Sequence, residues 1–266
     1  MELRGAVVVV TGASAGIGRS TAWAFASKGA TVVASARRVE RLDELVDQIE
    51  RRGGVASAVA CDVRAFADVE ALRDRVLELH GRCDVLVNNA GVPGGGDFLA
   101  LPIERIEQVI ETNLMGVVYG TKAFLPGMVE RGSGHVVNVA SLAGRFAVPG
   151  SAVYSATKHA VVAFSESLAH TTHPHGVLVT AVNPGLVATE TFPHTDAIEH
   201  GRKVMTPADI ARAIVHVVER GIWPEYSVPR WLSAMQVFRV VTPRAYRWGV
   251  SRATRGSYRP TNAVPN

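Results

Sequence analysis

Apolar runs alternate with amphipathic stretches along most of the chain, and this alternation indicates buried strands separated by helices. The runs that we expect to form strands are Ala6–Val10, Thr31–Ala36, Val55–Ala60, Asp84–Val87, His135–Val139 and Val177–Val182. The stretches that we expect to form helices are Gly18–Lys28, Val39–Arg52, Phe66–His80, Pro102–Arg131, Val153–His173 and Pro207–Arg220. Such strand-then-helix repeats, joined by short Gly-, Asn- or Pro-marked connections, predict an α/β fold: a doubly wound parallel sheet with helices on both faces. We expect one domain over residues 1–229.

Residues 230–266 form an extension of different character. They contain seven arginines and no Asp, Glu or Lys, so the formal charge of +4 is the sum of +7 on the extension and −3 on the rest. Apolar residues recur in it at the spacing of an amphipathic helix, at Trp231, Ala234, Met235, Phe238 and Val241.

Two interpretations of the extension stay open. An amphipathic helix beside arginines is typical of a peripheral contact with anionic lipid. The same stripe can instead pack on the body of the protein or on a sister subunit, with the arginines in solvent. The second interpretation is favoured because the stripe is short and contacts between subunits are common. Nucleic acid is not an expected partner, because the chain has no recognised nucleic-acid-binding motif.

Composition is that of an ordinary soluble globular protein, with 47% hydrophobic and 20% charged residues. Cys61 and Cys83 are too few and too far apart for a zinc framework, and we expect reduced core thiols. No metal is expected at His170, His173 and His175 either, which fall at a helix end and a Pro-containing turn. No apolar run reaches about 18 residues. The N-terminus leads directly into an apolar strand, so we expect a cytoplasmic protein, membrane-peripheral only if the extension binds lipid.

A glycine-rich turn joins the first expected strand to the first helix, and it reads Thr11-Gly12-Ala13-Ser14-Ala15-Gly16-Ile17-Gly18. Glycine permits a tight turn there and lets backbone N–H groups approach a pyrophosphate at the positive end of the helix. The glycine spacing differs from Gly-x-Gly-x-x-Gly, and no Lys-Ser/Thr follows to make a nucleoside-triphosphate loop. It resembles the fingerprint of the short-chain dehydrogenase/reductase family.

Further motifs of that family follow in the same order. Asp62 follows the third strand, Asn88-Asn89-Ala90-Gly91 the fourth, and Asn183-Pro184-Gly185 the sixth, with Thr189 beyond. The resemblance covers about residues 5–220 and implies a single Rossmann-type domain with about seven strands and a bound nicotinamide dinucleotide. By this resemblance, the residues expected to bind the dinucleotide are Gly12, Ser14, Ala15, Gly16, Ile17, Gly18, Arg37, Arg38, Asp62, Val63, Asn89, Ala90, Gly91, Tyr154, Lys158, Pro184, Gly185, Val187 and Thr189.

The choice between NADP(H) and NAD(H) is made at the end of the second strand, which reads Ser35-Ala36-Arg37-Arg38. No carboxylate is present there to bind a ribose 2′-hydroxyl, and Arg37 can offer a forked contact to a 2′-phosphate. We therefore expect NADP(H) to be preferred over NAD(H). The alternative is a solvated pair of arginines at a helix start. The family's other common basic position is Ala15 here, a departure that weakens the preference.

A phenol and an ammonium, Tyr154 and Lys158, lie four residues apart on one face of a helix. A nearby cation favours the phenolate and lowers the tyrosine pKa. Together with Ser141 after the fifth strand and Asn113 in the long fourth helix, they resemble the family's Asn-Ser-Tyr-Lys set. The resemblance implies that Tyr154 protonates a carbonyl oxygen that Ser141 positions. It also implies that Lys158 tunes Tyr154 and holds the nicotinamide ribose, and that Asn113 anchors a water.

The expected function is hydride transfer between NADP(H) and a carbonyl or secondary alcohol, in a homo-oligomer of two or four chains. Leu142–Ser151 and Leu186–Met205 are expected to border the substrate, and their apolar residues, including Phe146, Val148 and Phe192, suit a hydrophobic one. A catalytically idle NADP(H)-binding sensor or scaffold is an alternative. A second alternative, a 3-oxoacyl-thioester reductase, is disfavoured by the unusual C-terminus.

Overall fold

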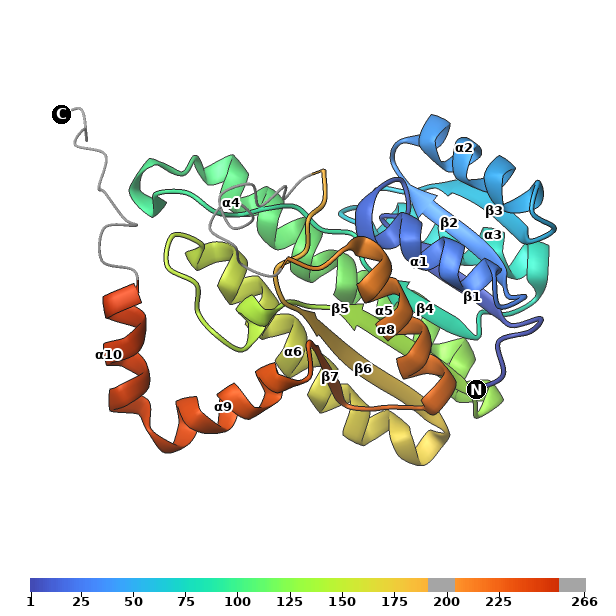
Figure 1. The fold of residues 1–266 in the computed structure, drawn as a ribbon. Helices are drawn as coiled ribbons and strands as arrows, with labels where there is room; N and C mark the ends of the chain where they lie inside the picture. The colour runs from blue at the N-terminus through green and yellow to red at the C-terminus, as the bar shows by residue number, and fades with distance from the viewer. Residues whose placement is uncertain (191–203, 254–266) are drawn as a thin grey trace.

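A seven-stranded parallel sheet forms the centre of the molecule (Figure 1). This is a computed structural model, and it describes residues 1–190 and 204–253. The strand order is β3-β2-β1-β4-β5-β6-β7, so the chain reverses its direction of travel across the sheet between β1 and β4. The strands are β1 Val7–Thr11, β2 Thr31–Ala36, β3 Val55–Ala60, β4 Val85–Asn88, β5 Gly134–Val139, β6 Val177–Pro184 and β7 Glu225–Val228.

Helices cover both faces of this sheet, which confirms the predicted fold class (Figure 1). Alternate side chains of β1 show the two layers: Val8 and Val10 belong to the core on one face, and Val7 and Val9 to the core on the other. The first face is covered by α1 Gly16–Ala26, α2 Val39–Glu50 and α8 Pro207–Arg220. The second is covered by α3 Phe66–His80, α5 Gly116–Arg131 and α6 Ala152–Thr172.

The long helix expected over Pro102–Arg131 is divided. It forms α4 Ile103–Ile110, a π-helical segment Glu111–Met115 and then α5. A π segment changes which side chains point inward, and such segments recur at functional sites. Here it places Asn113 in the interior, fully buried.

The C-terminal extension forms two helices, α9 Trp231–Val241 and α10 Pro243–Ala253, which project from the side of the molecule beyond β7 (Figure 1). The expected helix is therefore present, but its apolar stripe faces away from the body. Trp231 is 62% exposed and Val241 70%, and Leu232 is the buried residue of α9. The expectation that the stripe packs on the body is wrong, whereas packing on a sister subunit stays a prediction.

Candidate active site

A cavity of about 740 Å³ opens at the carboxyl ends of β1, β4, β5 and β6. This is the edge where the strand order reverses, and open α/β sheets bind ligands there. All but one of the residues expected to bind a dinucleotide line this cavity, together with Ser141 of the expected catalytic set. The two expected site residues that do not line it are Gly18 and Asn113.

The glycine loop is shaped by close approaches of backbone to backbone. Gly12 has a φ of +68°, and a Cβ there would lie 2.8 Å from the Cα of Ala90. A Cβ at Gly18 would lie 2.3 Å from the carbonyl oxygen of Gly12. Gly18 therefore packs the start of α1 against the loop instead of lining the cavity. Ala15 gives α1 no side-chain cap, so the first N–H groups of this helix are available to an anion.

The loop after β4 is tied to the end of β1 through Thr11. The Thr11 hydroxyl accepts hydrogen bonds from the backbone N–H groups of Asn89 (3.0 Å) and Ala90 (3.2 Å). The Asn89 amide returns a bond to the Thr11 carbonyl at 2.9 Å. These bonds fix the Asn-Asn-Ala-Gly segment relative to the glycine loop, so two walls of the cavity keep a constant position.

Two arginines that follow β2, Arg37 and Arg38, lie at the end of the cavity nearest that strand, which we call its outer end. The Arg38 guanidinium donates to the Ser14 hydroxyl through Nη2 (2.9 Å) and Nε (3.2 Å), beside the glycine loop. Arg37 lies 3.9 Å from a carboxylate oxygen of Asp62, and Arg64 holds the pKa of that carboxyl below its usual value. Both arginines line the cavity. They therefore face a ligand site as well as solvent, and Arg38, not Arg37, contacts the glycine loop.

The catalytic candidates meet at the inner end of the cavity. Ser141 lies just after the end of β5, and its hydroxyl is hydrogen-bonded to Tyr154 of α6. One turn further along α6, the Lys158 ammonium donates to the Val139 carbonyl at 2.9 Å and lies 5.8 Å from the centroid of the Tyr154 ring. A phenol, a hydroxyl and an ammonium thus converge at one point of the cavity wall.

Burial sets the pKa values of this group. Desolvation lowers the pKa of Lys158 to about 8. Desolvation also raises the pKa of Tyr154, and the hydrogen bond from Ser141 offsets this only in part. The direction for Tyr154 is opposite to the one predicted from sequence. The reason is that Lys158 directs its ammonium at a backbone carbonyl, while the phenol lies in a poorly solvated wall.

Asn113 lies behind the cavity wall. Its amide accepts from the Val92 N–H at 2.8 Å and donates to the Val92 carbonyl at 2.9 Å. It therefore fixes the segment that follows Gly91, and a Cβ added at Gly91 would lie 3.3 Å from the Asn113 Oδ1 and 3.9 Å from the Lys158 Nζ. Its role in anchoring a water stays a prediction.

Sequence reasoning missed part of the cavity wall. The segment Val92–Gly95 lines it, although Gly94-Gly95-Gly96 has no local pattern beyond flexibility. A Cβ at Gly94 would lie 2.8 Å from Val109 and 3.3 Å from the Tyr154 Cβ, so this glycine is required by close packing. The position after β4, at the same sheet edge as the glycine loop, was the signal that could have identified it.

The expected substrate segments are placed in part. Leu142, Val148 and Ser151 line the cavity, as do Leu186 and Val187. Phe146, by contrast, lies against Tyr246 of α10, with ring centroids 6.0 Å apart. Phe192 is outside the described residues.

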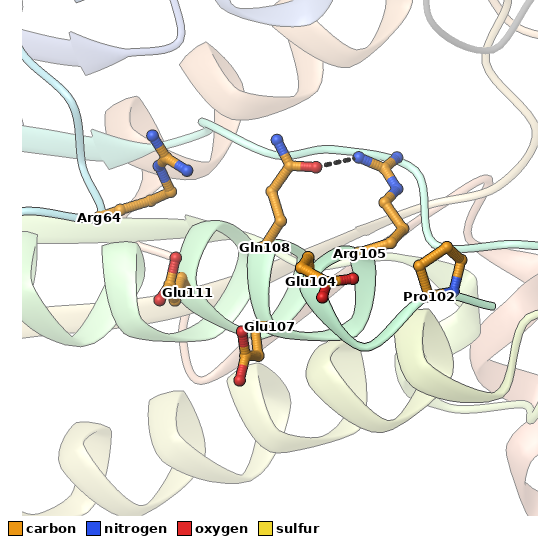
Figure 2. Close-up of a pocket in the computed structure, with 7 residues that line it drawn as sticks. All are labelled: Arg64, Pro102, Glu104, Arg105, Glu107, Gln108 and Glu111. Carbon is orange, nitrogen blue, oxygen red and sulfur yellow. Dashed lines mark hydrogen bonds between the residues drawn. The ribbon is translucent and has the colours of Figure 1, made fainter.

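A second hollow, of about 470 Å³, lies along α4 (Figure 2). Most of its side chains are exposed, and three of the seven carry carboxylates. Arg105 donates to Gln108 and to the Pro93 carbonyl. It brings together no nucleophile and base, so the chemistry is assigned to the larger cavity. No cluster of metal ligands occurs in residues 1–190 and 204–253. In the expected histidine turn, the His173 ring stacks on Trp223 at 4.3 Å.

Comparison with known proteins finds relatives over most of the chain. The family model described as short chain dehydrogenase matches residues 6–199. A putative ketoacyl reductase of Streptomyces coelicolor is 44% identical over 185 residues, which are 69% of this chain and 71% of the relative. Ketoacyl reductase HetN of Nostoc sp. is 33% identical over 258 residues, covering 92% of this chain and 90% of the relative.

Solved structures extend the similarity to three dimensions. A variant of actinorhodin polyketide ketoreductase, crystallised with NADPH, is 36% identical with a TM-score of 0.79, over 86% of this chain and 97% of that one. A short-chain dehydrogenase from Streptomyces avermitilis is 32% identical with a TM-score of 0.80, over 96% of this chain and 100% of that one.

Proposed function

Because the chain belongs to the short-chain dehydrogenase family, and is therefore an oxidoreductase, we propose that it transfers hydride between NADP(H) and a carbonyl or secondary alcohol of a hydrophobic substrate. The observation that supports this most directly is the convergence of Tyr154, Ser141 and Lys158 in one wall of the cavity whose other end is the glycine loop. That arrangement puts a proton donor at one end of a site and an anion-binding helix start at the other.

The residues present fit a dinucleotide. The cavity accepts a phosphate group at the uncapped start of α1, where a side chain at Gly12 would collide with Ala90. When bound, NADPH supplies the hydride. Gly12, Gly16 and Ile17 would hold the pyrophosphate, and Asp62 and Val63 would border the adenine. Tyr154 and Lys158 would lie beside the nicotinamide end.

In the reduction direction, Tyr154 donates its phenolic proton to the substrate oxygen. The raised pKa keeps that proton on the phenol at neutral pH, which suits a general acid. Ser141 donates a hydrogen bond to the same oxygen and orients it. The hydrogen bond between Ser141 and Tyr154 favours the phenolate that remains. Lys158 is mostly protonated at neutral pH despite its pKa of about 8, and its ammonium would hold the nicotinamide ribose.

NADP(H) preference is supported by Arg38 and Arg37 at the outer end of the cavity, with no carboxylate at the end of β2. A guanidinium bonded to Ser14 can turn its remaining N–H groups to a 2′-phosphate. Glu190 lies 3.8 Å from Arg38 and 2.8 Å from Arg41. A 2′-phosphate would therefore compete with the Glu190 carboxylate for the Arg38 guanidinium, which lines the cavity.

A 3-oxoacyl thioester is the second candidate substrate, because two relatives are named ketoacyl reductases. The test is a screen of NADPH oxidation over aldehydes, ketones, steroids and 3-oxoacyl thioesters. Turnover of any hydrophobic carbonyl supports the proposal, and a preference for the thioester selects the second candidate. NADPH binding without turnover across the whole panel would instead identify an idle sensor.

A further inference from the structure

Helix α9 directs polar side chains towards the body of the protein and apolar side chains away from it. Gln236 is half-buried and donates to Glu225 of β7 at 3.0 Å, and Arg239 lies over the Tyr246 ring of α10. The apolar residues that point outward are Trp231, Val237 (63% exposed), Phe238, Val240 (77%) and Val241. A helix that packs on its own domain shows the opposite arrangement. The outward face of α9 therefore needs another apolar surface.

The neighbouring helix α10 adds positive charge to this face. Arg244, Arg247 and Arg252 are exposed, and they flank Trp248, which is 67% exposed. Arg252 lies over the Trp248 ring, 5.7 Å from its centroid. No acidic residue occurs between positions 230 and 253. Exposed apolar groups, tryptophan and arginine without any carboxylate are the composition of an interfacial membrane contact.

We infer that α9 and α10 together form a docking surface for an anionic lipid bilayer, which this surface contacts without crossing. Charge decides between lipid and a second copy of the chain: two such arms would bring like charges together, whereas an anionic headgroup layer complements them. Length decides against a span. The 11 residues of α9 extend about 16 Å, roughly half of a hydrocarbon core, and no described helix is long and apolar enough to cross a membrane.

The docking surface is attached to the substrate side of the cavity. Tyr246 of α10 packs against Phe146, which lies in the segment whose Leu142 and Val148 line the cavity. Glu225 binds both Gln236 of α9 and Arg145 of the same segment. Docking would therefore hold this wall of the cavity next to the bilayer. The inference does not depend on the proposed reaction.

The experiment is flotation of the full chain with vesicles of phosphatidylcholine alone or with about one third phosphatidylserine. We expect binding to the anionic vesicles, little to the neutral ones, and weakening as salt is raised. Replacing the three exposed arginines of α10 (Arg244→Gln, Arg247→Gln and Arg252→Gln) should weaken partitioning about 100-fold. Val240→Ser with Val241→Ser should also weaken it, because two outward apolar side chains are lost.

The matched control removes the same charge elsewhere, through Arg51→Gln, Arg75→Gln and Arg212→Gln, which are exposed on the body. It should bind vesicles within a few-fold of the unmodified chain. Thermal unfolding of each variant shows that the body remains folded. The inference is overturned if the full chain stays unbound on anionic vesicles, or if control and arm variants lose binding equally. A dimer in sedimentation that Val240→Ser with Val241→Ser dissociates, without vesicle binding, would assign the surface to a second copy.

Discussion

At the nucleotide end of the cavity the walls are backbone held against backbone, whereas at the substrate end they are loops held by side chains from distant parts of the chain. Gly12 and Gly18 leave no room for a Cβ, and Thr11 joins the loops after β1 and β4. At the other end, Arg145 is held by Glu225, and Phe146 lies against Tyr246 of the extension. The nucleotide end is thus built within the common fold, and the substrate end depends on β7 and the extension beyond it.

Because the two ends are built separately, one scaffold can keep its cofactor site while its substrate site changes. Glu225 is the junction at the substrate end, because it accepts hydrogen bonds from Arg145, from Asn183 at 2.6 Å and from Gln236 at 3.0 Å. A substitution in the extension can therefore alter the position of Arg145 and its segment through Glu225, while the glycine loop stays unchanged.

The variant Tyr154→Phe tests the proposed proton donor, and it has the largest expected effect. We expect carbonyl reduction to fall about 1000-fold or more, because the proton donor is removed. NADPH affinity, measured by fluorescence titration, should change little, since the glycine loop is untouched. Tyr119→Phe, on α5 and outside the cavity lining, is the control. Retained turnover in Tyr154→Phe would refute the assignment of the acid.

Lys158 lies where the two ends meet, and its burial predicts a pH dependence of stability. Below about pH 8 the folded chain carries the cost of a buried ammonium. Between pH 8 and the unfolded value of 10.5 the folded chain releases the proton and the unfolded chain keeps it, so this contribution to stability rises with pH. The gain is on the order of 3 kcal/mol.

Urea unfolding of the wild type and of Lys158→Met near pH 7 and near pH 10 measures it. The free energy of unfolding of the wild type, relative to the variant, should increase with pH. The comparison with the variant cancels the buried thiols Cys61 and Cys83, whose raised pKa values act in the opposite direction in both proteins. A difference that is flat with pH would mean that Lys158 is solvated.

The glycine loop and the catalytic candidates could be predicted from the sequence because their determinants are local. Glycine spacing, the Tyr154 and Lys158 pair on one helix face, and Ser141 after a strand are patterns within a few residues of each other or at strand ends. The structure brings these residues, apart from Gly18, to the lining of one cavity, and their roles stay predictions. The contact of Arg38 with Ser14 of the glycine loop could not be predicted, because the backbone turn after β2 decides which side chain faces that loop.

The substrate end could not be predicted to the same depth because its determinants are distant or lack a pattern. The strand β7 is four residues, Glu225–Val228, without an apolar run. Over five residues, the side-chain periodicity of a π-helical segment cannot be told from that of an α-helix, so the segment Glu111–Met115 leaves no signal in the sequence. The raised pKa of Tyr154 depends on burial, which only the folded chain defines. The apolar periodicity of residues 231–241 predicted the helix α9, but it could not predict whether the apolar face packs on the body or faces outward.

Cofactor preference tests the outer part of the nucleotide end. Arg38→Ala should reduce the preference for NADPH over NADH, measured as the ratio of kcat/KM values, by about 10- to 100-fold, the loss of one or two charge-assisted bonds. Arg41→Ala removes a neighbouring arginine that binds Glu190 but does not line the cavity, and it should change the ratio less. A wild type that prefers NADH would contradict the proposed specificity altogether.

The smallest expected effect separates the two ends most directly. Glu225→Gln keeps the side-chain size but removes the charge that Arg145 needs, so the segment 142–151 should loosen. We expect KM for the carbonyl substrate to rise a few-fold, and the free energy of unfolding to fall by about 1 kcal/mol, the scale of a partly buried ion pair. The NADPH dissociation constant should stay unchanged. Glu166→Gln is the matched control, because Glu166 is half-exposed and lies 3.7 Å from the same arginine. Equal losses of NADPH affinity and substrate affinity in Glu225→Gln would contradict the separation of the two ends. A change at Glu225 would then alter the glycine loop as well as the segment 142–151.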